Sequence, residues 1–154
     1  MTITTIVKYI SESAFYICAE LTSVVIPSSV TYIAINAFHA CTGLTSVVIP
    51  TGIKKIEDST FRRCEAMTSV VIPTTVTTIG DLAFFHCISL TSITIPTSVK
   101  SLGLTFIGGM GNIPLIAPSS LTITAPALSG CQQLIESKTN HYLYYLRKVY
   151  HYHH

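Results

Sequence analysis

The chain has 154 residues, of which 49% are hydrophobic and only 10% charged, and its formal net charge is +2. Soluble domains usually carry about 25% charged residues, so serine and threonine must cover much of this surface. So small a net charge does not indicate a basic surface that would bind nucleic acid. The sequence also lacks an apolar run of the roughly 18 residues that a membrane span needs. Its first residues lack the basic and apolar regions of a signal peptide.

A unit of 23 residues recurs along most of the chain. Four cysteines and four prolines keep this interval, a regularity typical of a solenoid built by stacking one small unit. The cysteine column is Cys18, Cys41, Cys64 and Cys87, and the proline column is Pro27, Pro50, Pro73 and Pro96.

The coils follow one another without a linker, which predicts one solenoid over residues 1–133. Residues 1–20 fit only the later part of the unit, so the chain is interpreted as beginning inside a repeat, with a partial first coil. The last coil is degenerate, and its spacing is one residue short at two points. The strong coils are 21–43, 44–66 and 67–89, and the degenerate coils are 90–112 and 113–133.

Each strong coil opens with a strand, LTSVVIP in the first of them. Leu21, Val24 and Ile26 are expected to point into the core, while Ser23 and Val25 point the other way. The proline that follows cannot donate a hydrogen bond to a neighbouring strand, so it ends the strand after about five residues.

A compact return completes the coil. The spacing of three between Val30 and Ile33 favours a short helical or 3₁₀ turn that lays apolar side chains back onto the strand. Stacking at about 4.8 Å then joins equivalent residues into ladders. The predicted core ladder comprises Phe15, Phe38, Phe61 and Phe84 with Cys18, Cys41, Cys64 and Cys87.

The cysteines and histidines give no sign of catalysis. Small buried free thiols explain the cysteine column, although a disulfide between neighbours such as Cys41 and Cys64, or a metal site, stays open as an alternative. The sequence has no C-x-x-C pair of the kind that binds zinc. His39 and His86 fall at variable positions and are expected on the surface. We therefore expect no enzyme, no metal and no cofactor.

The segment 134–154 differs from the repeats and is rich in tyrosine and histidine. Apolar residues at spacings of three and four make an amphipathic helix plausible, which would cap the last coil. A disordered tail, or a segment that binds a membrane surface or a partner groove, remains an alternative.

The repeated pattern L-x-x-V-x-I-P-x-x-V-x-x-I-(x)3-A-F-x-x-C resembles the BspA-like class of leucine-rich repeats over about residues 3–112. The resemblance implies an α/β solenoid, a right-handed superhelix with a parallel sheet on its concave side. It also implies a non-catalytic binding protein, often adhesive and at a cell surface. Ala37 is replaced by Thr60 and then by Phe106 in later coils, so the late coils are expected to be looser.

The outward face of the strands is the candidate binding surface for a protein ligand. It is flat, uncharged and partly apolar, and variable residues beside it would give specificity. The alternative is that its β-branched residues serve strand propensity alone. The face comprises Ser23, Val25, Ser46, Val48, Ser69, Val71, Ser92 and Thr94, and the specificity residues are Tyr32, Lys54, Lys55, Arg62 and Arg63.

Several functional hypotheses therefore stand together. The first is an adhesive, surface-associated module, and the second is an intracellular interaction scaffold, which the missing export signal and the free thiols favour. A partial or decaying repeat protein without activity of its own is the third. A water-organising or ice-binding array of threonines is the fourth. Uncapped coil ends also predict self-association, since they expose strand edges and apolar ladders.

Overall fold

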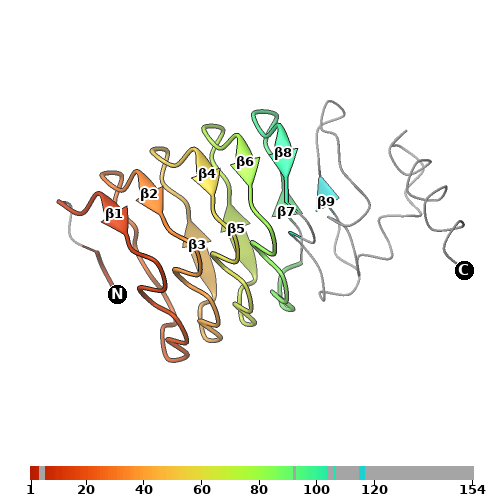
Figure 1. Ribbon diagram of the computed structural model, residues 1–154. Coiled ribbons are helices and arrows are strands. Elements are labelled where there is room, and N and C mark those ends of the chain that lie inside the picture. Colours follow the sequence, from red (N-terminus) through yellow and green to blue (C-terminus); the bar gives the residue numbers. More distant parts are fainter. Residues whose placement is uncertain (4–5, 92, 104–105, 107–114, 117–154) are drawn as a thin grey trace, which may run out of the picture.

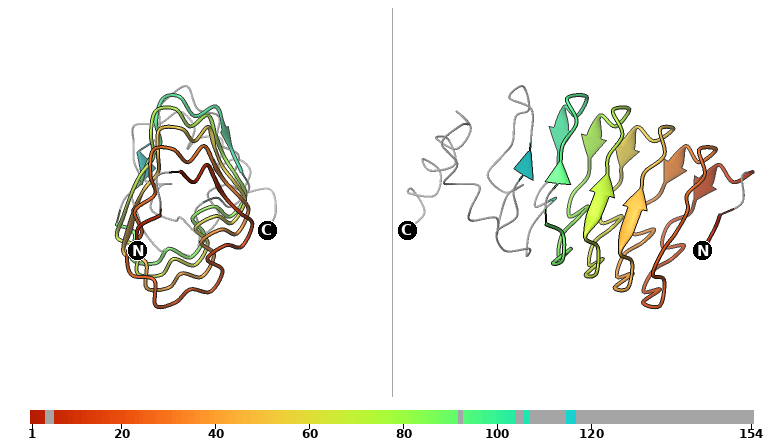
Figure 2. Two further views of the ribbon diagram at one scale, coloured as in Figure 1. Left: turned by 90° about the vertical axis from the view of Figure 1, so that its left-hand side faces the viewer. Right: turned by 180° about the vertical axis from the view of Figure 1, so that it is seen from behind.

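The computed structural model describes residues 1–3, 6–91, 93–103, 106 and 115–116. The chain winds into coils that stack in a row, and short strands of successive coils lie next to one another along the stack (Figure 1). Viewed along the stack, the strands fall on two different sides of the coil (Figure 2). We call these the first-strand row and the second-strand row.

The first-strand row is the one that the sequence predicts, although its strands have two or three residues rather than five. Val25 forms a parallel bridge with Thr2, and Ser46 pairs in parallel with Ser69, 23 residues further on. In the last pair, Ile93 lies opposite Leu115, which is 22 residues on, a one-residue shortfall of the kind expected for the sixth coil. The row contains β3 (Ser46–Val48), β5 (Ser69–Val71), β7 (Ile93–Thr94) and β9 (Leu115–Ile116).

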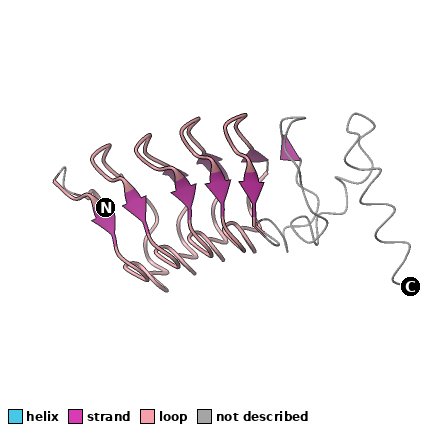
Figure 3. Ribbon diagram, turned by 45° about the horizontal axis from the view of Figure 1, so that its top comes forward, coloured by secondary structure: helices cyan, strands magenta, loops and turns pink. Residues whose placement is uncertain are grey.

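The second-strand row takes the place of the helical or 3₁₀ returns, which are not found among the described residues (Figure 3). The Val30 amide donates to the Pro27 carbonyl at 3.0 Å, which closes a turn, and the chain then extends to Ile33. A turn followed by an extended pair of residues buries side chains three residues apart, as a helical turn would. The spacing of three between Val30 and Ile33 therefore fits both conformations. The row contains β1 (Tyr9–Ile10), β2 (Tyr32–Ile33), β4 (Lys55–Ile56), β6 (Thr78–Ile79) and β8 (Ser101–Leu102).

After the second strand, each coil makes a series of tight turns. The Ala37 amide donates to Ala34 at 3.2 Å and the Cys41 amide to Phe38 at 3.3 Å. The third residue of each turn has a positive φ, 57° at Asn36 and 56° at Ala40, as a type II turn requires. The same conformation recurs in the neighbouring coils at Ser13, Ile17, Ser59, Arg63, Leu82 and His86.

Hydrogen bonds between these turns fix the stacking register. The Phe38 amide donates to the Thr60 carbonyl at 2.9 Å, and the Phe84 amide donates to Phe106 at 2.7 Å. Phe106 therefore occupies the column of Ala37, as the sequence alignment of the coils predicts. It is fully buried, so the late coil accommodates a large side chain where earlier coils have a small one.

A ladder of phenylalanines runs through the core. Phe38, Phe61 and Phe84 are fully buried, and each ring is nearly parallel to the next, with centroids 5.5 Å apart. Phe15 stacks on Phe38 at 5.0 Å but is only partly buried, because the described residues cover its coil on one side only. The ladder is thus complete in the middle of the stack and weaker at its first coil.

The second-strand row is divided between β2 and β4. β1 pairs with β2, and β4, β6 and β8 form a separate sheet. Gly52 lies at this division. In other coils the equivalent residue has a hydroxyl that donates a hydrogen bond to the preceding coil, as Ser29 does to the Val7 carbonyl at 2.8 Å. A Cβ at Gly52 would lie 2.7 Å from the Val30 carbonyl oxygen. Glycine therefore both removes one bond between the coils and permits the close approach of their backbones.

Some expectations lie outside the described residues. These are the placements of Ser92, of most of the degenerate coil 113–133 and of the segment 134–154. The right-handed superhelix and the concave position of the sheet stay predictions.

Candidate functional site

The first-strand face consists of the outward side chains of the first-strand row. Val25, Val48 and Val71 are 59%, 66% and 57% exposed, although valine is usually buried. Val48 and Val71 are Cα partners in adjacent strands, so their side chains form a column. The described members of the predicted face are all exposed: Ser23, Val25, Ser46, Val48, Ser69, Val71 and Thr94.

The inward side chains of the same strands alternate with these and are buried. Val47 and Ile49 are each 2% exposed, and Ile93 is 1% exposed. Because one side of each strand is buried in the core, the register of the exposed column is fixed. The face is therefore rigidly supported by the core beneath it.

The threonines at the strand starts bond to the backbone of the preceding coil. Thr45 Oγ1 donates to the Thr22 carbonyl at 3.1 Å, and Thr68 Oγ1 donates to the Thr45 carbonyl at 3.2 Å. These hydroxyl protons are used between coils, which leaves each oxygen only as an acceptor for a ligand. This arrangement gives the threonine column a structural role that a water-organising array does not require.

The five predicted specificity residues do not lie on the first-strand row. Tyr32 and Lys55 belong to β2 and β4, with Lys54 just before β4, so these three lie on the second-strand row. Arg62 and Arg63 lie in the turns that follow. The structure thus brings together the serine and valine column but separates it from the residues predicted to confer specificity.

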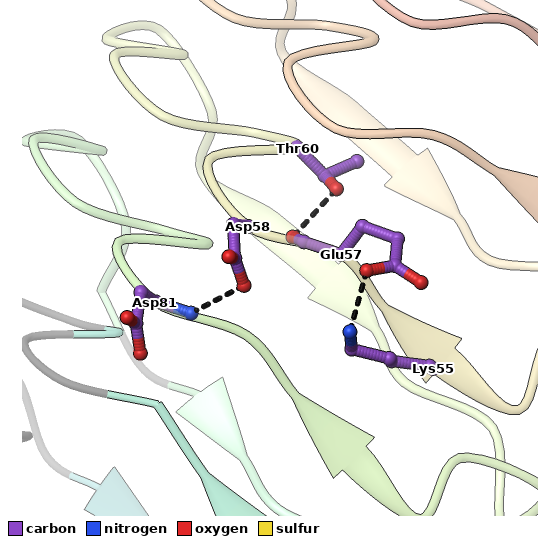
Figure 4. Close-up of polar contacts among 5 residues, drawn as sticks. All are labelled: Lys55, Glu57, Asp58, Thr60 and Asp81. Atoms are coloured by element: carbon purple, nitrogen blue, oxygen red, sulfur yellow. Dashed lines mark hydrogen bonds and ion pairs between the residues drawn. The ribbon is translucent and has the colours of Figure 1, made fainter.

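In the coil 44–66, Lys55, Glu57 and Asp58 make polar contacts within the molecule (Figure 4). Lys55 Nζ lies 2.6 Å from Glu57 Oε2, and this hydrogen bond is the main cause of a raised Lys55 pKa. The Asp58 carboxylate accepts the Asp81 amide of the next coil at 3.0 Å, while Thr60 Oγ1 donates to the Glu57 carbonyl at 2.7 Å. The Asp58 carboxylate therefore links this coil to the next one, and the Glu57 carboxylate is occupied by Lys55.

The two arginines also have contacts within the chain. Arg63 Nη2 lies 3.2 Å from Glu65 Oε1, and the Arg62 guanidinium carbon lies 5.6 Å from the centre of the Phe85 ring. Arg62 Nε is buried without a hydrogen-bond partner among the described residues. The Arg62 side chain therefore packs as part of a column rather than projecting freely into solvent.

His39 belongs to that column, and its expected surface position is only partly correct. It is half-buried, its ring meets that of Tyr16 edge to face at 4.9 Å, and its Nδ1 lies 3.2 Å from Asn36 Oδ1. Burial, with a smaller effect from Arg62 and Arg63, lowers the His39 pKa. His86 is likewise half-buried, against Phe85. Both histidines pack against neighbouring aromatic rings.

The described cysteines are all free, and three of them are buried. Cys41 Sγ donates to the Phe15 carbonyl at 3.1 Å, and Cys64 and Cys87 make the same contact with the phenylalanine of the preceding coil. Burial raises the pKa of Cys41 to about 11 and that of Cys87 to about 12, and raises the Cys64 pKa above any physiological range. These thiols stay protonated and act as small apolar groups with a weak donor.

Cys18 differs from the rest of its column, and its assignment to the buried ladder is wrong. It is exposed, because the described residues cover its coil on one side only. Within the described part of the chain, no cluster of three or more His, Cys, Asp or Glu side chains is placed to hold a metal ion. Nor do the described residues contain a helix that is long and apolar enough to cross a bilayer.

A second exposed face was not predicted from the sequence. Tyr9 is 68% exposed and Tyr32 42% exposed, and they are Cα partners in β1 and β2. The sequence signal for this face is a pair of variable residues that precedes the buried Ile10 and Ile33 column in every coil. The spacing of this pair also fits the helical turn that was expected there.

The stacked coils, parallel strand rows and continuous core define a repeat solenoid. Comparison with protein families agrees: the BspA type leucine rich repeat region matches residues 1–114 in six copies. The chain belongs to this family. Proteins built from such repeats are generally non-enzymatic. No curated protein matches the chain at a significant level.

Solved structures show the same architecture. A leucine-rich repeat protein from Bacteroides ovatus is 30% identical with a TM-score of 0.75, over 79% of this chain and 34% of that one. A leucine rich cell surface protein from Faecalibacterium prausnitzii is 34% identical with a TM-score of 0.64, over 76% and 31%. The T. pallidum leucine rich repeat protein is 31% identical with a TM-score of 0.65, over 68% and 51%. The chain thus spans about a third to a half of the length of these proteins.

Proposed function

We propose that the protein is a non-enzymatic protein-binding module that holds an extended segment of its partner along the first-strand face. The observation that carries this proposal is the column of exposed valines, which is flanked by serines and is free of charge. Burial of the apolar valine surface would drive association, with a favourable transfer free energy of about 25 cal/mol per Å². The serine hydroxyls would bond to the partner's backbone.

The rigid support of this face favours binding. Because the core fixes the strand register, few side chains have to become ordered when a partner docks, which lowers the entropic cost. Regular spacing along the stack suits a partner whose side chains also repeat at a strand-like interval.

Selection of peptides on the purified chain tests the proposal. We would select a displayed library of random linear peptides on the wild-type protein and measure the affinity of the enriched peptides for a Val48→Glu, Val71→Glu variant. The expected loss is about tenfold or more, since two buried contacts become buried charges. A Thr51→Glu, Thr74→Glu variant, with the same added charge at exposed turn positions, serves as the control.

The control should keep the wild-type affinity. Equal affinity of the peptides for the wild type and the valine variant would exclude the first-strand face as their site. Circular dichroism of both variants would show that the fold is retained.

We further propose that the module acts in adhesion at a cell surface. The family resemblance supports this role, and one structural neighbour is described as a cell surface protein. Treatment of intact cells with a protease that cannot cross the membrane is the test. Cleavage of the protein would support surface exposure, and protection of the protein in the soluble fraction would contradict it.

An intracellular interaction scaffold is the second candidate. The observation that favours it is the set of free, protonated thiols, which suits a reducing compartment. The same protease experiment separates the two candidates, since the scaffold would be protected.

Self-association through the coil ends remains a proposal as well. In the first coil, Ile17 is 59% exposed and Phe15 is only partly covered, so a second molecule could bury both. Sedimentation at tens of micromolar tests this, and a monomer there would count against it.

A further inference from the structure

The second-strand row presents a face of its own, composed of the exposed residue pairs that precede its buried isoleucine and leucine column. We call it the second-strand face. Its described members are exposed apart from the half-buried Thr78: Lys8, Tyr9, Thr31, Tyr32, Lys54, Lys55, Thr77, Thr78, Lys100 and Ser101.

The lysines of the described residues gather on this face. All four lysines of the described residues lie on it. Of the acidic residues near it, Glu57 pairs with Lys55, and its residue surface is 9% exposed. The described part of the chain shows no ion pair for Lys8, Lys54 or Lys100. A chain with a nearly neutral composition therefore has one side on which free cations gather.

These three lysines stand in one column with a regular interval. Lys8, Lys54 and Lys100 are 46 residues apart, which is two coils of 23, and the Lys8 and Lys54 carbonyls accept amides of the same column in the next coil. Two strand spacings amount to about 9.6 Å, so the row offers one free ammonium group roughly every 10 Å.

Exposed tyrosines lie beside the lysines. Tyr9 and Tyr32 are paired in adjacent strands, and both rings are exposed on the surface. A tyrosine ring combines an apolar face with a polar tip, which suits a flat ligand that has carbon–hydrogen surfaces and hydroxyl groups together.

We propose that the second-strand face binds an extended acidic polysaccharide with one carboxylate per disaccharide. Sugar rings would pack on Tyr9 and Tyr32, and the acidic groups would meet Lys8, Lys54 and Lys100. The sparse charge argues against nucleic acid, because phosphates recur about every 3.4 Å along each strand and need a denser array of cations. This inference goes beyond the proposed protein binding, which uses the other row of strands.

Hyaluronan fragments longer than the row test the proposal, with dextran of the same length as the uncharged control. The full chain should bind hyaluronan but not dextran, and added salt should weaken the binding. A Lys8→Gln, Lys54→Gln, Lys100→Gln variant should lose about tenfold in affinity, as expected when three exposed ion pairs of modest strength are removed together.

A charge-matched variant separates local contacts from net charge. Ala19→Glu, Thr42→Glu and Ser89→Glu also lower the net charge by three, but at positions outside the second-strand face, and this variant should retain most of the affinity. The Tyr9→Ser, Tyr32→Ser variant leaves the charge unchanged and should still weaken hyaluronan binding severalfold through lost ring contacts.

Three results would overturn the inference. They are absence of hyaluronan binding, an equal loss in the lysine variant and the charge-matched variant, and tighter binding of a thymidine oligonucleotide of equal length. None of them bears on peptide selection at the first-strand face, so the two proposals fail independently.

Discussion

Truncation of the central phenylalanine is the sharpest test of the packing described here. Phe61 is fully buried and stacks on both Phe38 and Phe84 at 5.5 Å. Phe61→Ala should lower the free energy of unfolding by about 3–5 kcal/mol, the usual cost of removing a buried aromatic ring and leaving a cavity. Two interfaces between coils lose contacts at once, and in a solenoid stability depends on such nearest-neighbour interfaces.

Phe15→Ala is the matched control. Phe15 is only partly buried and stacks on one ring, Phe38. Its removal should cost about 1–2 kcal/mol, in line with its smaller buried area. The two variants thus differ by their position in the same ladder and not by chemistry.

Urea unfolding followed by circular dichroism would measure both losses, with the slope of the transition checked for two-state behaviour. Equal losses in the two variants would refute the argument that the ladder is strongest in the middle of the stack. A wild-type chain that unfolds without cooperativity would instead support a decaying repeat protein.

Other consequences concern the turns, the close packing of coils and the thiols. Ala40→Gly should stabilise the fold by about 1 kcal/mol in urea unfolding, since its φ is 56°, whereas Ala37→Gly, without a positive φ, should destabilise it. Gly80→Ala should cost about 1–3 kcal/mol, because a Cβ there would lie 2.7 Å from a backbone nitrogen of the preceding coil. Maleimide at neutral pH should label Cys18 in the folded protein but not Cys41, and labelling of both would contradict the described burial. The raised Cys41 pKa means that the folded state favours the neutral thiol. The contribution of Cys41 to the free energy of unfolding is therefore complete below pH 9.0 and is lost as pH rises toward about 11. Alkaline unfolding of wild type and Cys41→Ala would measure that difference.

Features that depend on a period of two or of 23 could be predicted from the sequence. The outward column of Val25, Val48 and Val71 follows from alternation in a strand. The position of Phe106 in the column of Ala37 follows from counting along the repeat, even though the residue types differ. Stacking then converts a linear count into neighbours in space.

The return of each coil could not be predicted, for a physical reason. A spacing of three between buried residues is produced both by a helical turn and by a tight turn followed by an extended pair, and the pattern alone does not separate them. The positive φ values at Ile17 and Leu82 gave no signal, because glycine or asparagine usually marks this conformation. As a result, Tyr32, Lys54 and Lys55 were predicted beside the first-strand face and not on a row of strands of their own.

The same reasoning applies to the cysteine column. Burial of Cys41 follows from its place in the repeat, but exposure of Cys18 depends on which coils cover it, and that is a property of the stack. The candidate binding face was therefore predictable where it depends on strand alternation. Its separation from Lys54 and Arg62 required the path of the whole coil.

Photo-crosslinking tests the central claim most directly. A photoreactive amino acid at position 48, on the first-strand face, would be compared with one at position 55, on the second-strand face, in the presence of peptides selected on the wild-type protein. Crosslinks from position 48 and none from position 55 are predicted. Crosslinks from position 55 alone would show that the partner binds elsewhere and would contradict the proposed function.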